Sequence, residues 1–326
     1  MISTPVRPLV RAAALAAALA VGFVAAPGAA VAAAPQGKTQ APGYYRMMLG
    51  DFEVTALSDG TVDLPMDKLL KQPAARTTSE LKKGFLGVPT ETSVNGFLIN
   101  TGSKLVLIDT GAGGLFGPTL GKLAASLQAA GYQPGQVDDI FITHMHPDHV
   151  GGLAAGGQAA FPNAVVHIDK RDTDFWLSAD TLAKAPEGEK GMVQGAQASL
   201  APYVAAGKLQ PFEGASELVP GVRSLPSHGH TPGHASYVIE SKGQKLVVIG
   251  DLIHVGAVQL DDPAVTIDFD SDRKAAAAQR AAVFAQAAKE GDWVAAAHLS
   301  FPGLGHLRAA GKSWQWIAAN YTIELK

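Results

Sequence analysis

All ten histidines of this 326-residue chain lie after residue 143, and six of them fall in two short clusters. The first cluster contains His144, His146 and His149, and the second contains His228, His230 and His234. Histidines that only filled a hydrophobic core would be scattered along the chain. The clustering therefore favours a fold that brings the two segments together at one site.

The first cluster follows an apolar stretch, residues 139–143, that is typical of a β-strand. It reads His144-Met-His146-Pro-Asp148-His149. On a loop after a strand, ring nitrogens at alternate positions can converge on one cation, while the next carboxylate and imidazole reach a second cation nearby. By composition alone, such a string should occur in well under about one in a thousand chains of this length. The chain has no cysteine, so every candidate metal ligand must offer nitrogen or oxygen.

Together with its neighbouring segments, this string resembles the signature of the metallo-β-lactamase superfamily. Asp109, in the segment 107–111, resembles the strand-end aspartate that orients metal-binding histidines in that family. His230 resembles the ligand of the third motif, Asp251 the bridging aspartate, and His298 the final ligand. The resemblance implies an α/β fold, the αβ/βα four-layer sandwich of the family.

The resemblance also implies how two metal ions share the ligands. One ion is expected on three histidines, the second on an aspartate and two histidines, and one aspartate is shared between the ions: His144, His146 and His230; Asp148, His149 and His298; and Asp251. Two divalent ions about 3.5–4 Å apart can bridge a water, lower its pKa and stabilise the charge that develops during hydrolysis. We therefore expect a binuclear hydrolase in which a metal-bridging hydroxide attacks the substrate. Zinc suits these ligands, and cobalt, manganese and iron also fit them.

Within the superfamily, the chain resembles the exported methyl parathion hydrolase and lactonase-like branch over nearly all of its length after residue 43. The likeness includes residues 50–54, 250–259 and 298–306. In members of this branch that are specialised for phosphotriesters, an aliphatic residue stands in the place of His254. The polar ring favours a lactone or an aryl ester as substrate, with phosphotriester (organophosphate) hydrolysis as a side activity.

His254 and two aromatic residues are the predicted substrate contacts. His254 follows Asp251 by three residues, where it could hydrogen-bond the substrate or the leaving group as a catalytic residue. Phe116 and Trp176 match aromatic pocket positions of the same branch, but both residues would fit a hydrophobic core equally well.

Other functions fit the residues less well. A dedicated organophosphate hydrolase is the first alternative. A β-lactamase usually lacks the shared aspartate, and a di-iron oxidoreductase normally has a glutamate in place of His146 and a flavin domain beyond. The chain has no Gly-x-Ser-x-Gly motif for a serine mechanism, and a scaffold role would require a broken ligand set.

The four remaining histidines are predicted to be structural. His167 lies in an apolar strand-like stretch and is expected in or near the core. His228 and His234 flank a ligand and are expected to support the loop, and His306 follows a glycine-rich turn.

Residues 1–32 have the features of an export signal. Arg7 and Arg11 precede an apolar run, residues 12–26, and small residues follow around position 32. A run of this length is short of the roughly 20 residues that a membrane-spanning helix needs. We expect cleavage after Ala32, a flexible leader over residues 33–43, one hydrolase domain over residues 44–326, and a periplasmic or secreted product that is not bound to the membrane. The formal net charge of −3 does not suggest nucleic acid as a partner.

Short apolar stretches predict strands, and two longer segments predict helices. The strands are expected at residues 52–57, 96–100, 104–109, 139–143, 164–168, 245–250 and 294–297, and the helices at residues 118–130 and 272–289, the second capped by Ser271 and ended by Gly291. Residues 178–215 fit either a solvated helix pair or a flap over the site. A homodimer is expected only from the resemblance, with residues 63–90 as its contact arm.

Overall fold

The computed structural model of the chain describes residues 1, 3, 34 and 36–325. The predicted export signal, residues 1–32, lies outside the described residues except for its first and third positions. Residues 40–326 form one compact unit. In the part of the chain that is described, no helix has the length and hydropathy needed to cross a membrane.

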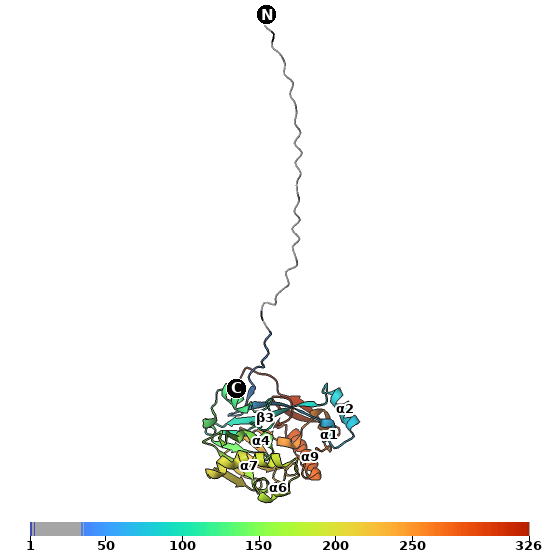
Figure 1. The fold of residues 1–326 in the computed structure, drawn as a ribbon. Coiled ribbons are helices and arrows are strands. Elements are labelled where there is room, and N and C mark those ends of the chain that lie inside the picture. The colour runs from blue at the N-terminus through green and yellow to red at the C-terminus, as the bar shows by residue number, and fades with distance from the viewer. Residues whose placement is uncertain (2, 4–33, 35, 326) are drawn as a thin grey trace. The chain divides into compact units, whose positions relative to one another are not determined.

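Two seven-stranded sheets form the centre of this unit (Figure 1). The first sheet runs in the order β1 (Tyr44–Leu49), β2 (Phe52–Leu64), β3 (Thr90–Asn100), β4 (Leu105–Ile108), β5 (Asp139–Phe141), β8 (Val165–Asp169) and β9 (Leu209–Phe212). The second runs in the order β10 (Glu217–Val219), β11 (Val222–Pro226), β12 (Ala235–Ser241), β13 (Gln244–Val248), β14 (Trp293–Ala295), β15 (Leu304–Ala310) and β16 (Ser313–Ala318). Neighbouring strands are antiparallel except for β4–β5, β5–β8 and β8–β9 in the first sheet and β13–β14 in the second.

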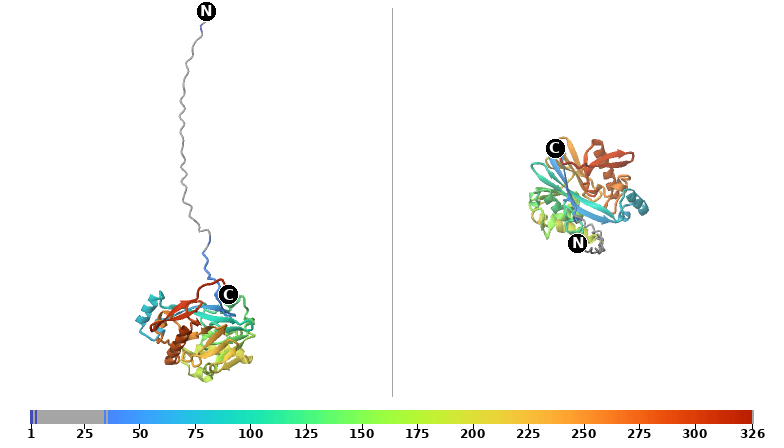
Figure 2. Two further views of the ribbon diagram at one scale, coloured as in Figure 1. Left: turned by 180° about the vertical axis from the view of Figure 1, so that it is seen from behind. Right: turned by 90° about the horizontal axis from the view of Figure 1, so that it is seen from above.

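The alternating residues of the strands pack into different layers of the core. Val106 and Ile108 of β4 contact the second sheet, whereas Leu107 faces the helices on the other side. This alternation is the period of two that a β-strand imposes. Seen from above, the blue-to-teal strands of the first sheet separate the green helices from the orange and red second sheet (Figure 2). The architecture is therefore the α/β sandwich of four layers that the sequence predicts.

The helices cover the outer faces of the two sheets or connect the strands. They are α1 (Met66–Leu69), α2 (Ala74–Lys83), α3 (Leu123–Ala129), α4 (Pro147–Val150), α5 (Lys170–Trp176), α6 (Ala179–Lys184), α7 (Lys190–Ala205), α8 (Gly256–Gln259) and α9 (Arg273–Glu290), with short 3-10 turns η1 (Pro134–Gln136), η2 (Gly151–Leu153) and η3 (Gly250–Leu252) and a small hairpin, β6 (Ala154–Ala155) and β7 (Gln158–Ala159). Leu200 and Tyr203 of α7 are buried against the first sheet, and Val283 and Phe284 of α9 against the second.

Two predicted helix starts are wrong. The predicted helix over residues 118–130 begins only at Leu123, because Gly121 has a φ of 77° and its N–H donates to Asp59. The long helix α9 is capped by Asp272, whose side chain accepts from the N–H of Ala275, and not by Ser271. The Ser271 hydroxyl donates instead to the carbonyl of Gly229. The stop at Gly291 is confirmed, with a φ of 73°.

Residues 178–215 form the helix pair α6 and α7, followed by β9. The pair is not simply solvated, because α7 buries Val193, Ala196 and Leu200. The half-buried Met192 of α7 also lies in the wall of a cavity at the histidine cluster. Residues 63–90 contain α1 and α2, which pack on α8 at the edge of the unit (Figures 1 and 2). Dimerisation through them stays a prediction.

The loop between β4 and α3 is held in place by one buried carboxylate. Asp59 of β2 is 1% exposed and accepts the N–H groups of Ala112, Gly121 and Leu123, each at 2.9 Å. Two of the donors share Oδ2 and the third meets Oδ1. A carboxylate is the side chain that can accept at both oxygens without donating.

We predict that Asp59→Asn destabilises the protein by about 2 kcal/mol, because the amide group must face at least one N–H donor and leave it unpaired. Asp63→Asn, on the exposed face of the same strand, is the control and should change stability by less than about 0.5 kcal/mol. The measurement is urea unfolding followed by circular dichroism. Equal unfolding midpoints for the two variants would contradict this role of Asp59.

Candidate metal centre

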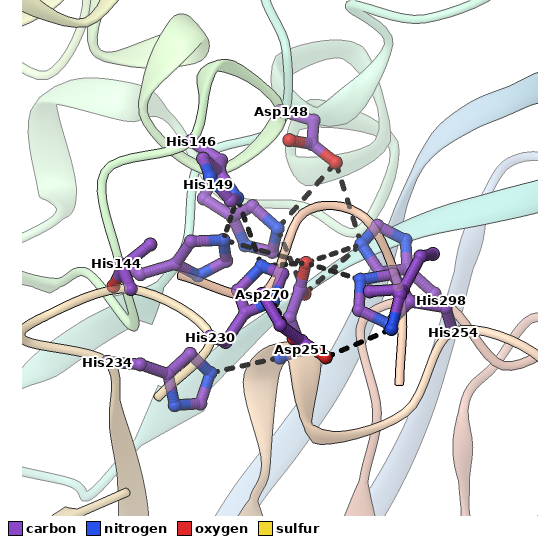
Figure 3. A network of polar contacts seen from close by, with 12 residues as sticks. His144, His146, Asp148, His149, His230, His234, Asp251, His254, Asp270 and His298 are labelled. Carbon is purple, nitrogen blue, oxygen red and sulfur yellow. Dashed lines mark hydrogen bonds and ion pairs between the residues drawn. The ribbon is translucent and has the colours of Figure 1, made fainter. Parts of the chain in front are cut away.

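The candidate site lies where strands of both sheets end. His144 and His146 follow β5, and Asp148 and His149 lie on the short helix α4. His230 lies between β11 and β12, Asp251 lies on η3 after β13, and His298 follows β14. The carboxyl ends of the parallel pairs β4–β5 and β13–β14 thus bring residues distant in the sequence together, as Figure 3 shows.

The first donor group is formed by His144, His146, His230 and one oxygen of Asp251. Nδ1 of His146 lies 2.9 Å from Nε2 of His144 and 3.0 Å from Nε2 of His230. Oδ2 of Asp251 lies 3.5 Å from Nε2 of His144 and 3.2 Å from Nε2 of His230. Three ring nitrogens and a carboxylate oxygen therefore face one common point.

The second donor group is formed by Asp148, His149 and His298. Oδ2 of Asp148 lies 3.7 Å from Nε2 of His149 and 3.5 Å from Nε2 of His298. The other oxygen of Asp251, Oδ1, lies 3.1 Å from both of these nitrogens. Oδ1 of Asp251 thus faces the second group, while Oδ2 faces the first group and also lies 3.1 Å from Nε2 of His298. The carboxylate lies between the two groups, as expected of a bridging ligand.

Three of the histidines are oriented so that their inner nitrogens carry lone pairs. Nδ1–H of His149 donates to Asp109 Oδ2 at 2.8 Å, that of His230 to Asp270 Oδ1 at 2.8 Å, and that of His298 to the carbonyl of Ser93 at 2.9 Å. A neutral imidazole that donates at Nδ1 offers an unprotonated Nε2 to a metal.

Two atoms inside the cluster point to a cation. Nε2 of His149 and Oδ1 of Asp251 are buried 3.1 Å apart, yet in this geometry neither atom makes a hydrogen bond. Buried polar atoms without partners are rare, because leaving one unpaired costs about 1–3 kcal/mol. A divalent ion coordinated by both atoms would satisfy them, and nitrogen and carboxylate donors suit such an ion. The residues present therefore fit the two-metal centre that the sequence predicts.

The electrostatics of the cluster agree with this role. Burial alone would raise the pKa of Asp251, but His298, His149 and His144 around it hold that pKa well below its usual value. Burial lowers the pKa of His149, yet the carboxylates of Asp251 and Asp109 outweigh burial and raise it well above the ordinary value. Burial also lowers the pKa of His230, but the carboxylates of Asp251 and Asp270 outweigh it and raise that pKa to about 9. The buried carboxylate of Asp251 is thus ionised and needs positive charge beside it.

His234 supports the bridging aspartate from outside the two donor groups. The backbone N–H of Asp251 donates to Nε2 of His234 at 3.1 Å, so the proton of this imidazole must be on Nδ1, beside Ser227. Burial lowers the pKa of His234 to about 3, which keeps the ring neutral. Gly250 has a φ of 50°, and a Cβ there would lie 2.7 Å from the same Nε2. Figure 3 shows this ring approaching Asp251 from the side opposite His298.

Arg280 of α9 supports the segment after Asp251, and the sequence gives no sign of it. The side chain is fully buried, and its guanidinium donates to the carbonyls of Leu252, Pro263 and Val265. Burial lowers its pKa to about 10, so the group stays charged at neutral pH. A buried cation bonded to three carbonyls fixes the chain on the carboxyl side of the bridging aspartate.

Asp109 and Asp270 are both part of the site, but only Asp109 was predicted. Asp109, at the end of β4, also accepts the N–H and the hydroxyl of Thr143, each at 2.8 Å. Asp270 precedes α9 in a run of polar residues, where no motif distinguishes it. Of the other histidines, His167 pairs with Asp139 at 2.9 Å, His228 lies 3.2 Å from Asp169, and Nδ1 of His306 lies 3.0 Å from the carbonyl of Asp292.

A cavity opens onto the donor cluster. Its wall is mostly apolar, and the residues that line it are six hydrophobic side chains together with donor residues and their neighbours: Val62, Leu64, Phe116, Leu120, Met192 and Phe269; His146, Pro147, Asp148, Asp251, His254 and His298. Phe116 and His254 line this cavity, and their contact with a substrate stays a prediction. Val62, Leu64, Leu120, Met192 and Phe269 were missed, because nothing in the sequence distinguishes them from ordinary core residues.

Trp176 lies behind the donor cluster. Its ring is 5% exposed and packs edge-on against the imidazole of His146, with the ring centroids 5.4 Å apart. It lines a neighbouring cavity, which shares Met192 with the first one. The structure therefore places Trp176 against a candidate ligand and outside the lining of the first cavity.

His254 is closer to the donor groups than the sequence suggested. Its Nε2 lies 3.2 Å from Oδ2 of Asp251, and its ring stacks on that of His298 with centroids 5.1 Å apart. With Asp251 and His298 it forms a third group that could hold an ion. Burial lowers its pKa to about 4, against the opposing effect of Asp251, so the ring is neutral at pH 7.

The sequence and the structure are similar to those of known metal-dependent hydrolases. Residues 89–298 match the sequence model of the Metallo-beta-lactamase superfamily. A solved structure described as hydrolase AbOPH in the beta lactamase superfamily is 40% identical, with a TM-score of 0.82 over 87% of this chain and 100% of that one. AidC, described as a dizinc quorum-quenching lactonase in complex with its product, is 28% identical, with a TM-score of 0.79 over 86% of this chain and 98% of that one.

The curated relatives match a shorter part of the chain. The N-acyl homoserine lactonase of Bacillus thuringiensis is 26% identical over 172 residues, which cover 47% of this chain and 60% of the relative. The chain thus spans about 60% of the length of the curated relatives that it matches.

We predict that Asp251→Ala lowers the metal content below two ions per chain and lowers hydrolytic activity by roughly 100-fold or more, because even residues that only orient ligands typically contribute 10- to 100-fold. Metal content is measured by mass spectrometry after dialysis, and folding by circular dichroism. His228→Ala is the control, since its ring contacts Asp169 and Arg171 rather than a donor group. Two tightly held ions in folded Asp251→Ala protein would refute the bridging role.

Proposed function

Because this chain belongs to the metallo-β-lactamase superfamily, we propose that it is a hydrolase that uses two divalent metal ions, zinc in the first place, to cleave lactones or aryl esters. The observation that carries this proposal is the carboxylate of Asp251, whose two oxygens face two separate donor groups at the floor of an open cavity. Two divalent ions held there would supply Lewis acidity and an activated water at neutral pH.

The protein's own residues supply the binding and the orientation. Asp109, Asp270 and the carbonyl of Ser93 each hold one imidazole with its Nε2 directed inward. Phe116, Leu120 and Phe269 form an apolar part of the cavity wall, which would exclude bulk water from a bound substrate. In the structure, these groups already stand in the positions that the site requires. Such preorganisation is a major source of the rate enhancement of enzymes.

The lining of the cavity favours a neutral substrate. Among the described residues that line it, none is lysine or arginine, so no cationic side chain would assist the metal ions in binding a phosphate monoester or a carboxylate. An apolar wall with a few polar groups suits a lactone, an aryl ester or a phosphotriester. The similarity to AidC and to the Bacillus relative, both lactonases, supports the lactone as the first choice.

His254 should decide between these neutral substrates. Its neutral ring lines the cavity beside Asp251, where it would hydrogen-bond the substrate or the leaving group. The tetrahedral centre of a phosphotriester carries more substituents than a planar ester carbonyl. We therefore propose that the polar ring favours lactones and esters and leaves phosphotriester hydrolysis as a side activity. A dedicated organophosphate hydrolase would show the opposite preference.

The test is turnover by the zinc, cobalt and manganese forms on aryl acetates, dihydrocoumarin, acyl-homoserine lactones and paraoxon. We expect kcat/KM to be highest for a lactone or an aryl ester. His254→Leu should shift the ratio of lactone to phosphotriester turnover toward the phosphotriester by about tenfold, which corresponds to about 1.4 kcal/mol in relative transition-state binding. His228→Leu, the same change outside the cavity, should leave the ratio unchanged.

Two results would count against the proposal. Absence of turnover on the whole panel by protein with two bound ions would refute hydrolysis of these substrates. An unchanged ratio in His254→Leu protein would remove His254 from the specificity-determining residues while leaving hydrolysis intact.

A further inference from the structure

Asp172 is a buried carboxylate close to the donor groups that belongs to none of them. It lies in the first turn of α5 and is fully buried. None of the groups that could hold an ion contains it. Its burial therefore needs another explanation, because a charged group is rarely buried without specific partners.

The partners of Asp172 come from two separate loops. Oδ2 accepts the N–H of Met145 at 2.9 Å and the hydroxyl of Thr231 at 3.0 Å, and Oδ1 accepts the N–H of Gly233 at 2.6 Å. Met145 stands between His144 and His146, and Thr231 directly follows His230. One carboxylate thus joins the two loops that carry the histidines of the first donor group.

Among the described strands, no strand next to one loop pairs with a strand next to the other, although the backbone N–H of Ala235 donates to the carbonyl of Thr143 at 2.8 Å. The loop with His144 and His146 follows β5 of the first sheet, whereas His230 lies between β11 and β12 of the second sheet. The helix start also packs tightly on the second loop, since a Cβ on Gly233 would lie 2.4 Å from the backbone nitrogen of Asp172. At the other end of the same helix, Trp176 packs against the ring of His146. Helix α5 therefore touches both loops.

Among the described residues, no hydrogen bond joins α5 to the second donor group. Asp148 and His149 lie on α4, and His298 is held by the carbonyl of Ser93. A substitution at Asp172 should therefore weaken binding of the metal ion in the first donor group and leave binding of the ion in the second group unchanged.

We propose that Asp172 is a positioning residue that sets His144 and His146 against His230 and so controls the affinity of the first donor group for its metal ion. This inference rests on the metal centre proposed above. Three donors converge on Asp172, and only an ionised carboxylate accepts from all of them. An asparagine would turn its NH₂ toward at least one N–H or hydroxyl and lose that contact.

The test is stepwise metal binding by Asp172→Asn protein, measured by zinc titration against a competing chelator and by the absorption spectrum of the cobalt form. We expect one binding step to weaken by about 10- to 100-fold, the range typical of residues that orient metal ligands, and the other to stay within about twofold. His230→Ala and His298→Ala protein identify the steps, because each lacks a ligand of one group. The weakened step of Asp172→Asn should be the one that His230→Ala loses.

Asp174→Asn is the matched control. Asp174 lies on the same helix, its side chain is 61% exposed, and it pairs with Lys170 rather than with either loop. Asp174→Asn protein should bind both metal ions as tightly as the unaltered protein does. Thr231→Val removes only the hydroxyl contact and should weaken the same binding step by a smaller factor. This variant replaces Asp172→Asn in the test if Asp172→Asn protein does not fold.

The outcomes separate the two proposals. If the unaltered protein does not bind two ions, the metal centre is wrong, and this inference fails with it. If the unaltered protein binds two ions and folded Asp172→Asn protein binds both equally well, or loses both equally, Asp172 does not position the first group. Selective weakening of the step shared with His230→Ala supports the positioning role.

Discussion

The carboxylate of Asp251 is the constraint on which the rest of the site depends. It is buried among the imidazoles of His149, His230 and His298, and each of its oxygens faces a different donor group. A buried anion is costly unless positive charge and hydrogen bonds compensate it. The imidazoles around it provide part of that compensation, and two metal ions would complete it. The fold can be understood as the framework that holds this group in place.

Much of that framework is built from carboxylates at the ends of strands and helices. Asp109 follows β4 and holds His149, Asp270 precedes α9 and holds His230, and Asp172 begins α5 and holds two loops. Asp59 of β2 accepts backbone N–H groups of the loop that carries Phe116 and holds that loop in place. Each of these residues is buried and accepts several hydrogen bonds, which fixes ligands and cavity wall before a substrate binds.

The sequence predicts the residues that are close together in the chain better than those that meet only in the fold. The string from His144 to His149 and the Asp251 motif are local patterns, and the structure brings their side chains together. Asp172 and Asp270 were missed, because their partners are distant in the sequence and an isolated aspartate has no distinctive pattern. The cavity residues Met192 and Phe269 were missed because they reach the site only in the fold, and nothing in the sequence distinguishes them from core residues.

Helix starts predicted from local sequence patterns were wrong where tertiary contacts opposed those patterns. Residues 118–122 were predicted to be helical, but Asp59 binds the N–H of Gly121, so the helix starts later. Ser271 is a good cap in isolation, yet its hydroxyl is used by the loop that carries His230. Both departures lie beside the site. At these positions a contact with the loops of the site outweighs the local preference of the chain.

The most direct test of the account is anomalous diffraction at the zinc edge from crystals of the zinc-loaded protein. The account predicts two peaks, one among His144, His146 and His230 and one among Asp148, His149 and His298, with the carboxylate of Asp251 between them. A single peak, or a second ion held by His254 in place of Asp148 and His149, would contradict it.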